Sequence, residues 1–258
     1  MLDRYNKVVI LGLGGTGSIL APLLARYLFS EKFTGRLILV DGDIYSDTNS
    51  NRQIFSALHI GKNKAEYQAM VLVSHLPDLE PQIEVIDRYI GEDDAALLVE
   101  DGTIVVNCSD NFAARKIIED NMDKCNDAIH ICCGNDLFTG QVQVHSRIDG
   151  KDITPSIYQR SPNFNSLVGD RSKMSCEEMA ALPGGGQLIT ANATSAILAL
   201  NMFVQCTSDE KLFLGGEWLP CDMVGFNTRQ NGFVSEGKME IDLGKVIQYV
   251  PKRLQASV

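Results

Sequence analysis

The chain has 258 residues, of which 45% are hydrophobic, and a formal net charge of -10. This length and composition are typical of one large α/β domain with a full core, and two separate domains are not required. The negative charge argues against nucleic acid as the main partner, because phosphate contacts need a basic face, whereas a basic protein partner would be attracted.

The first predicted element is a buried strand, the apolar run from Val8 to Leu11. A glycine loop follows it, and residues 19–28 then carry an apolar pattern at helical spacing. In this order of strand, loop and helix, glycines let the backbone turn tightly and approach a phosphate, while amide groups at the helix N-terminus face the anion. The glycines that we expect at a nucleotide are Gly12, Gly14, Gly15 and Gly17.

A second predicted strand, residues 36–40, ends in Asp41. An acidic residue at this place can hydrogen-bond a ribose, and the alternative role is that of a turn residue that ends the strand. Glycine loops of this kind serve NAD, FAD, S-adenosylmethionine and ATP alike. The first 41 residues therefore predict the mononucleotide-binding half of a Rossmann-like fold. They do not identify which nucleotide binds.

The segment after Asp41 favours a triphosphate, because it holds Arg52 and Lys64 together with Asn49 and Gln53. A dinucleotide needs little cationic charge here, since its pyrophosphate lies on the helix end, whereas a triphosphate needs Mg2+ and cationic side chains. The planar fork of arginine and the point charge of lysine suit that task. Solvated surface charges are the alternative interpretation of Arg52 and Lys64.

The middle of the chain predicts alternating helices and strands. We expect helices over 62–76, 93–99 and 111–124, strands over 83–90, 103–107 and 128–133, and an antiparallel strand over 141–145. This order predicts a Rossmann-like, doubly wound and mostly parallel sheet with an antiparallel C-terminal extension.

Asp110 follows the predicted strand over 103–107, at the sheet edge where ligands bind in open α/β sheets. A carboxylate there suits Mg2+, which prefers oxygen ligands. The alternative role for Asp110 is to cap the helix that begins near Asn111. The position at the sheet edge favours the metal.

The C-terminal part begins with a polar, irregular stretch over 146–175, which we interpret as a crossover above the nucleotide site. Cys176 then lies in the first turn of a predicted helix. Helix N-termini lower the pKa of a thiol and favour the thiolate nucleophile, although the neighbouring glutamates oppose this effect. A structural cysteine is the alternative. A long helix over 187–205 and a hairpin within 211–236 complete the prediction.

The seven cysteines include no Cys-x-x-Cys pair, so we expect neither a disulfide scaffold nor a structural zinc. Cys108, Cys132 and Cys133 lie in or beside apolar strands and are interpreted as core packing. The four histidines have no partner that the sequence identifies. The first residues lack the pattern of a secretory signal, and no apolar run approaches the roughly 20 residues of a membrane span. We therefore expect a reduced, cytoplasmic protein that does not span a membrane.

Several motifs together resemble one family. With the glycine loop and Asp41, the segments Asn49-Ser50-Asn51-Arg52-Gln53, Gly61-Lys62-Asn63-Lys64 and Cys108-Ser109-Asp110-Asn111 resemble the ThiF/MoeB branch of the ubiquitin-activating, E1-like adenylyltransferase superfamily. The resemblance covers residues 7–147 well and the rest more loosely. Residues 175–180 resemble ThiF-family proteins of PRTRC-type gene clusters.

The resemblance implies one adenylation domain over residues 1–258, with a nucleotide-binding core over 1–147 and, over 148–258, the crossover loop, the catalytic-cysteine helix, the long helix and the hairpin. It implies ATP-dependent adenylation of the C-terminal carboxylate of a ubiquitin-like β-grasp protein by a homodimer. Thioester formation on Cys176 is a further step. The residues implied at the nucleotide and its Mg2+ are Asn49, Arg52, Gln53, Lys64, Asp110 and Asn111.

Two other functions stay open. One is adenylation of a small-molecule, peptide or tRNA-base carboxylate, and the acidic charge counts mildly against tRNA. The other is an NAD- or FAD-binding oxidoreductase or a nucleotide-sensing module. Arg52 and Lys64 discriminate against a redox site, because redox dinucleotides do not need these cations.

Overall fold

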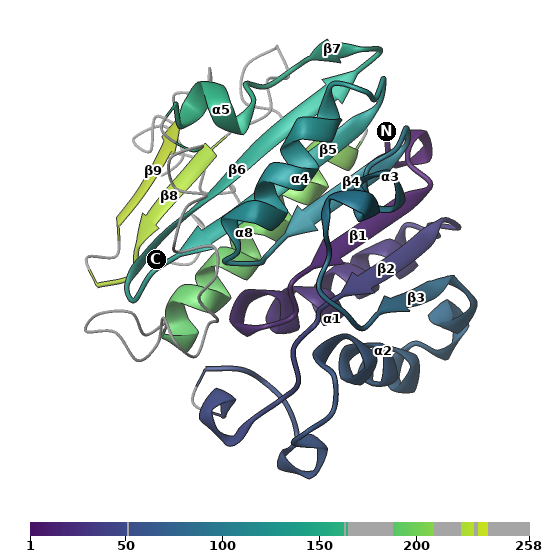
Figure 1. Cartoon of the computed structure of the whole chain (residues 1–258), viewed down its shortest axis with the longest axis vertical. Helices are drawn as coiled ribbons and strands as arrows, with labels where there is room; N and C mark the ends of the chain where they lie inside the picture. The colour runs from purple at the N-terminus through teal and green to yellow at the C-terminus, as the bar shows by residue number, and fades with distance from the viewer. Residues whose placement is uncertain (51, 163, 165–187, 209–222, 230–231, 237–258) are drawn as a thin grey trace, which may run out of the picture.

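The structure, a computed structural model, describes residues 1–50, 52–162, 164, 188–208, 223–229 and 232–236. The described residues form a nine-stranded mixed sheet, in which eight strands follow the order β3-β2-β1-β4-β5-β6-β8-β9 and β7 pairs with β6 (Figure 1). The parallel strands are β1 (Lys7–Leu11), β2 (Arg36–Val40), β3 (Ile83–Ile86), β4 (Thr103–Asn107) and β5 (Ala128–Asn135). The antiparallel strands are β6 (Thr139–Ile148), β7 (Lys151–Asp152), β8 (Met223–Asn227) and β9 (Gly232–Glu236).

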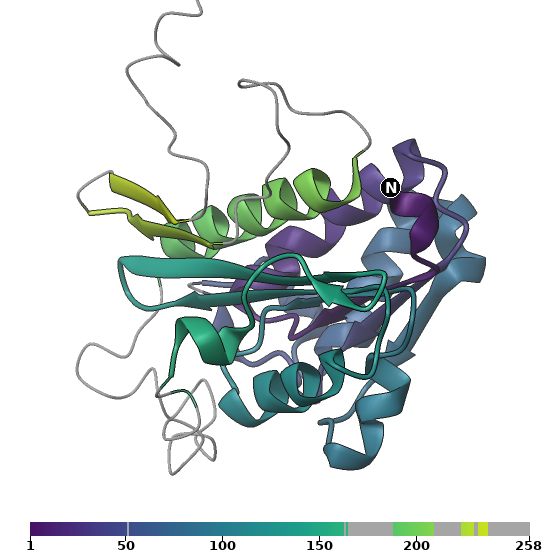
Figure 2. The same cartoon turned by 90° about the horizontal axis from the view of Figure 1, so that it is seen from above.

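Helices cover both faces of this sheet. The helices are α1 (Gly15–Ser30), α2 (Lys64–His75), α3 (Ala95–Leu98), α4 (Phe112–Met122), α5 (Ile157–Arg160) and α8 (Ile189–Thr207). Figure 2 shows α1 and α8 on one face and α4 and α5 on the other. The central strands are therefore buried on both sides. This burial explains why their sequences are unbroken apolar runs rather than alternations of apolar and polar residues. The predicted doubly wound sheet with an antiparallel extension is confirmed.

Short 3-10 turns connect these elements. They span Leu2–Arg4, Asp47–Asn49, Ala57–His59, Pro77–Gln82 and Glu92–Asp94. The main core cluster lies between the sheet and the α1/α8 face, where Leu20, Leu24 and Phe203 are fully buried. A second cluster lies under α3 and α4 and includes Ile118 and Met122.

Several predicted elements differ in extent from the structure. The strand predicted over 83–90 ends at Ile86, because its only partner in the described sheet, β2, ends at Val40 opposite Ile86. The helix predicted over 93–99 is reduced to a 3-10 turn followed by α3. The stretch predicted as irregular from residue 146 still belongs to β6 up to Ile148 and also contains β7 and α5, because β6 continues beyond its predicted end and pairs with β7.

Helix α8 has 19 residues and a mean hydropathy of 1.2, so its length and composition alone would allow it to cross a membrane. The helix packs against α1, β5 and β6. Its residues Ala196, Ala199 and Phe203 belong to the main core cluster. These contacts are those of a core helix, and the expectation that the protein does not span a membrane stays a prediction.

Candidate functional site

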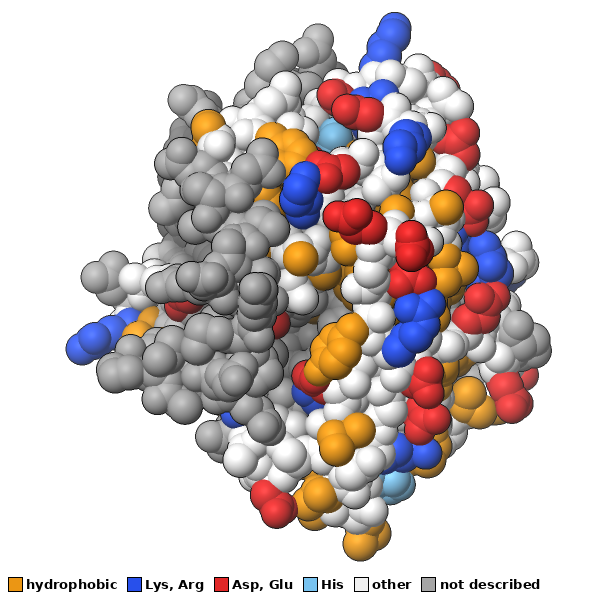
Figure 3. Space-filling model, viewed as in Figure 1, with side chains coloured by type: hydrophobic (Ala, Val, Ile, Leu, Met, Phe, Trp, Pro, Cys, Tyr) orange, Lys and Arg blue, Asp and Glu red, His pale blue; other side chains and the backbone are white. Residues whose placement is uncertain are grey.

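A cavity lies at the carboxyl ends of the parallel strands, between the start of α1 and the start of α4. Figure 3 shows a hollow on the face seen in Figure 1, where acidic, basic and hydrophobic side chains meet. The cavity is lined by the glycine loop, by the ends of β1, β2 and β5, by the residues that follow β4, and by Lys64. Open α/β sheets bind their ligands at this edge.

The glycine loop places backbone atoms at the cavity wall, where no side chain covers them. Gly12 has a φ of 87°, which favours glycine, and its N–H donates to the Val40 carbonyl at 2.8 Å. A Cβ on Gly17 would lie 1.9 Å from the Gly12 carbonyl oxygen, so only glycine allows α1 to start against the loop. Gly12, Gly14 and Gly15 line the cavity, whereas Gly17 acts in packing behind them.

The first turn of α1 also faces this cavity, because Gly15 and Thr16 line it. The helix begins at Gly15, earlier than the apolar pattern from residue 19 predicts, and its N-cap, Gly14, provides no side-chain cap. Backbone amides at such an end, together with the helix dipole, favour a bound anion. This part of the cavity suits a phosphate.

Asp41 links the glycine loop to the end of β2. Its carboxylate accepts hydrogen bonds from the Leu13 N–H at 2.6 Å and from the Asp43 N–H at 2.8 Å. Burial raises the pKa of Asp41, and nearby Lys64 opposes that rise. Asp41 also lines the cavity, so the predicted ribose contact stays compatible with its structural role.

Lys64 lies at the start of α2 with only 3% of its side chain exposed, and its ammonium contacts the Asp43 carboxylate at 2.9 Å. Burial would raise the pKa of Asp43, but the charge and hydrogen bond of Lys64 and a hydrogen bond from Tyr89 lower it overall. Both members of the pair line the cavity. Lys64 is thus a cation held at the predicted phosphate site.

Sequence reasoning assigned no role to Asp43 or Tyr89. Asp43 could have been recognised from the sequence, because it follows Asp41 by only two residues. In the structure both aspartates line the same cavity. Tyr89 falls in a segment that the sequence predicts as strand, and nothing in the sequence places its hydroxyl against Asp43.

Asn49, Arg52 and Gln53 are buried beside the cavity but do not line it. The Asn49 side chain accepts a hydrogen bond from the Ser46 N–H at 3.1 Å and so shapes the 3-10 turn Asp47–Asn49. The Arg52 guanidinium donates to the Thr48 carbonyl at 3.0 Å. Their predicted contacts to phosphate stay predictions, and the structure shows that these residues also hold their own loop together.

Asn192 of α8 anchors this loop. Its amide donates to the Arg52 carbonyl at 3.3 Å, and its side-chain oxygen accepts from Asn135 of β5 at 2.8 Å. Asn135 in turn accepts from the Thr16 hydroxyl at 3.2 Å. This chain of contacts joins α8, β5 and α1 around the cavity, and no sequence pattern predicts it because the residues are far apart along the chain.

Asp110 and Asn111 lie between β4 and α4, and both line the cavity. The Asn111 side chain accepts hydrogen bonds from the Ala113 and Ala114 N–H groups at 2.8 and 3.3 Å, so Asn111 is the helix cap. The alternative role considered for Asp110, capping α4, therefore falls to Asn111. The Asp110 carboxylate stays at the predicted metal position.

The described residues include no group of three or more His, Cys, Asp or Glu side chains arranged to hold a metal ion. Mg2+ is commonly held by one or two carboxylates together with substrate phosphates. Asp110, with Asp41 and Asp43 in the same cavity, fits that mode when a nucleotide is present. Cys176 and its predicted helix lie outside the described residues.

Curated relatives of this chain are activating enzymes. The Ubiquitin-like modifier-activating enzyme 5 of Drosophila melanogaster is 32% identical over 125 residues, which is 45% of this chain and 30% of the relative. The Adenylyltransferase and sulfurtransferase UBA4 of Meyerozyma guilliermondii is 30% identical over 209 residues, which is 79% of this chain and 45% of the relative. The matches thus span less than half the length of these curated relatives.

The fold is similar to that of solved structures of E. coli MccB. The structure of MccB with ATP has a TM-score of 0.66 and 22% identity, and the match covers 92% of this chain and 65% of MccB. PaaA has a TM-score of 0.60 and 20% identity, and its match covers 92% of this chain and 65% of PaaA. At these identities the likeness concerns the fold alone. The model of the ThiF family matches residues 2–218, and the chain belongs to this family.

Proposed function

We propose that the protein uses ATP and Mg2+ to adenylate the C-terminal carboxylate of a ubiquitin-like β-grasp protein. The observation that carries this proposal is the cavity that joins a glycine loop and a helix N-terminus to the buried Lys64 ammonium. The curated relatives include enzymes named for activating ubiquitin-like modifiers and for adenylyl transfer, which supports the same chemistry.

In the proposed reaction a carboxylate oxygen attacks the α-phosphorus of ATP, an acyl-adenylate forms and pyrophosphate leaves. The protein has to hold the two reactants in line and to stabilise charge that develops on the phosphates. The α1 N-terminus and Lys64 supply positive potential for the phosphates, and Asp41 receives the ribose. Arg52 and Gln53 reach the phosphates when their loop adjusts around the nucleotide. Asp110 would hold Mg2+ together with the nucleotide, and the bound ion would supply further charge neutralisation.

A peptide carboxylate is a second candidate substrate, because solved structures of the similar fold include MccB with MccA. The two candidates differ in the partner that stimulates the reaction. ATP–pyrophosphate exchange measured with a β-grasp protein ending in Gly-Gly, and separately with an unstructured peptide of the same last residues, distinguishes them. Exchange with the folded protein alone supports the proposal, and equal exchange with the peptide refutes the requirement for a β-grasp partner.

The choice of ATP over a redox dinucleotide is tested by calorimetry. We expect ATP with Mg2+ to bind and NAD not to bind, because Lys64 provides the cation that a triphosphate needs and a redox dinucleotide does not. Binding of NAD without binding of ATP would contradict the proposal.

Two further parts of the proposal concern assembly and the fate of the acyl group. We propose a cytoplasmic homodimer, as the family resemblance implies, and light scattering at micromolar concentration measures its mass. We also propose that Cys176 attacks the acyl-adenylate and forms a thioester with the partner. The position of Cys176 in the sequence, after a long polar stretch, supports this step.

A further inference from the structure

Among the described residues, the cationic side chains that line the cavity are Lys64, Arg88 and Arg115, and they differ in what neutralises them. Lys64 is paired with Asp43 at 2.9 Å. Arg88 is paired with Asp94 at 2.6 Å. Arg115 of α4 is half-buried and pairs with no carboxylate in the described part of the chain, because its hydrogen bonds run to backbone carbonyls. A half-buried charge without a counter-ion attracts an anion.

The guanidinium of Arg115 is held in one orientation. Its Nε and Nη2 donate to the Ser109 carbonyl at 3.2 and 2.8 Å, and Nη2 also donates to the Cys133 carbonyl at 2.7 Å. The group lies over the ring of Phe112, 5.1 Å from its centre. Arginine carries five N–H donors. The two on Nη1 therefore remain, and among the described residues they have no hydrogen-bond partner.

The Nη1 edge of Arg115 lies at the cavity wall beside Gly134 of β5. Both residues line the cavity. A Cβ placed on Gly134 would lie 3.4 Å from Nη1, which is the nearest atom it would meet. Because Gly134 has no side chain, it leaves Nη1 uncovered on this side. The two N–H groups are thus available to a ligand in the cavity.

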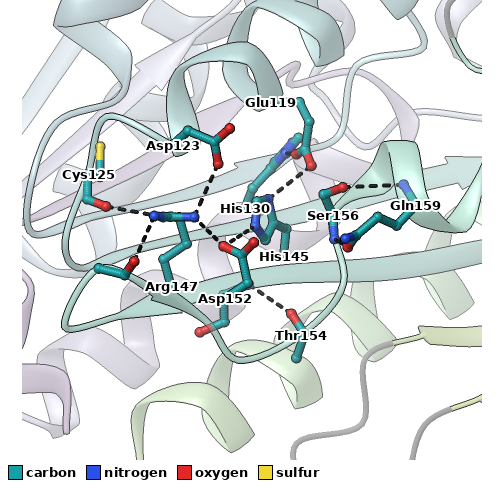
Figure 4. A network of polar contacts seen from close by, with 12 residues as sticks. Glu119, Asp123, Cys125, His130, His145, Arg147, Asp152, Thr154, Ser156 and Gln159 are labelled. Atoms are coloured by element: carbon teal, nitrogen blue, oxygen red, sulfur yellow. Dashed lines mark hydrogen bonds and ion pairs between the residues drawn. The ribbon is translucent and has the colours of Figure 1, made fainter.

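The helix that carries Arg115 is anchored to the sheet one turn further on. Figure 4 shows the Glu119 cluster, in which Glu119 of α4 meets His130 of β5 and His145 of β6. The Glu119 carboxylate lies 2.8 Å from the Nδ1 of His130 and 2.9 Å from the Nδ1 of His145, and none of the three side chains is more than 2% exposed. Arg115 is therefore fixed at both its backbone and its guanidinium, and a group held in this way loses little entropy when a ligand binds.

Arg115 reaches the cavity from the face of the sheet opposite to the predicted phosphate contacts. Helices α1 and α2, which supply the backbone amides and Lys64, pack in the main core cluster. Helix α4 packs in the second cluster, on the other face (Figure 2). In a displacement at phosphorus the attacking and leaving oxygens lie roughly in line, on opposite sides of the phosphorus. With pyrophosphate leaving beside Lys64, the attacking group is expected beside Arg115.

We propose that Arg115 binds the carboxylate of the substrate and guides it to the α-phosphorus. This inference rests on the proposed adenylation, because that reaction requires a carboxylate in this cavity. The triphosphate is an anion, and Asp41, Asp43 and Asp110 line the same cavity. An incoming carboxylate is therefore repelled unless a cation receives it. Hydrogen bonds from a guanidinium to a carboxylate are charge-assisted and directional, which suits the positioning of a reactant.

The test compares two peptides that differ only at the last group. One ends in Gly-Gly with a free carboxylate, and the other is the same peptide with a C-terminal amide. Their binding to the full chain is measured by calorimetry with Mg2+ and an ATP analogue that has a methylene group between the α- and β-phosphorus, so that no acyl-adenylate forms. We expect the wild-type protein to bind the carboxylate at least about tenfold more tightly, the usual size of a charge-assisted hydrogen bond.

Three variants locate this preference. In Arg115→Gln the two peptides should bind equally, while the affinity for the nucleotide analogue changes less than about twofold. Gly134→Ala keeps the hydrogen bonds of Arg115 and adds a methyl group 3.4 Å from Nη1, so it should weaken binding of the carboxylate even if Arg115→Gln does not fold. The matched control is Lys116→Met, which removes the next cation of α4. Lys116 is paired with Asp120 and is 39% exposed, and its removal should leave the preference unchanged.

Equal binding of the two peptides to the wild-type protein, or no binding of either, would overturn the proposal. A carboxylate preference that persists in Arg115→Gln would also overturn it, and a loss of nucleotide affinity in that variant would assign Arg115 to a phosphate instead. Failure of the proposed adenylation gives a different result, because the nucleotide analogue would then not bind. The two peptides, compared again without nucleotide, would still show whether Arg115 selects the carboxylate.

Discussion

The Lys64 ammonium lies 2.9 Å from the Asp43 carboxylate in the cavity at the carboxyl ends of the parallel strands, and only 3% of the Lys64 side chain is exposed. Burying a lysine is costly unless a carboxylate accompanies it. Asp43 therefore allows a cation to be kept ready at the predicted phosphate site before a nucleotide arrives. The pair explains why the acidic residues after β2 and the lysine at the start of α2 belong to one site.

We predict that Lys64→Met lowers partner-dependent ATP–pyrophosphate exchange by about a hundredfold, because one charge that stabilises the reacting phosphates is lost. The matched control is Lys62→Met. Lys62 lies two residues earlier, is paired with Glu66 at 3.6 Å, and has 36% of its side chain exposed. Its removal should leave exchange unchanged, and equal losses in both variants would point to a general effect of charge.

We predict that Gly17→Ala destabilises the fold by about 3 kcal/mol or more, because its Cβ would lie 1.9 Å from the Gly12 carbonyl oxygen and overpack the loop. Gly91→Ala is the control. Gly91 has an extended backbone with a φ of -124°, and a Cβ there meets no atom within 4 Å. Urea unfolding should show a change of less than about 1 kcal/mol for Gly91→Ala. Similar losses in the two variants would contradict the account of the glycine loop.

We predict that the free energy of unfolding falls as the pH falls from about 4.5 to about 2, in part through Glu119. Burial opposes ionisation of this carboxyl, but its contacts with His130 and His145 lower its pKa from 4.5 to about 2. Between these values the unfolded chain binds more protons than the folded chain, so acid favours unfolding.

The lowering of the Glu119 pKa from 4.5 to about 2 corresponds to a contribution of about 3 kcal/mol at most. Urea unfolding of wild type and Glu119→Gln over this pH range measures it. The difference in stability between the two proteins should shrink as the pH falls, and a difference that does not change with pH would show that Glu119 is not the group that titrates.

The sequence predicted the central fold correctly because its signals are local. Unbroken apolar runs mark β1, β2 and β4, since these strands are covered on both faces, and the glycine loop marks the start of α1. The ends of elements were less predictable. The true end of β3 depends on where its partner β2 stops, and no pattern within residues 83–90 contains that information.

Side-chain partnerships across strands were the part that sequence could not supply. Both histidines of the Glu119 cluster fall within predicted strands, but a one-residue change of register between β5 and β6 would separate them. Asn192 could not be linked to Arg52, since only the packing of α8 brings them together.

We predict that Arg52→Ala and Asp110→Ala each lower partner-dependent exchange by about a hundredfold while the fold is retained. Asp110 is expected to act through Mg2+, and Arg52 through the phosphates. Circular dichroism and urea unfolding check the fold of both variants. Arg26→Ala, which changes an exposed arginine of α1, is the control. Normal exchange in either variant would remove that residue from the proposed mechanism.

The last prediction separates adenylation from thioester formation. Cys176→Ala should still form the acyl-adenylate, because attack of a carboxylate on the α-phosphorus requires no thiol. The variant should fail to form a conjugate with the β-grasp partner that denaturing gels resolve and that a thiol reductant cleaves.

Cys132→Ser is the matched control for this experiment, since Cys132 is a buried thiol of β5 that does not line the cavity. It should keep both exchange and the conjugate. Cys176 is the expected nucleophile because of its position in the sequence: a polar segment precedes it, a helix is predicted to begin there, and helix starts favour thiolate. A conjugate that survives in Cys176→Ala and disappears in Cys132→Ser would move the thioester to β5, beneath Arg115. A conjugate that survives in both variants would exclude both thiols, and loss of exchange in Cys176→Ala would show that this residue acts before any thioester can form.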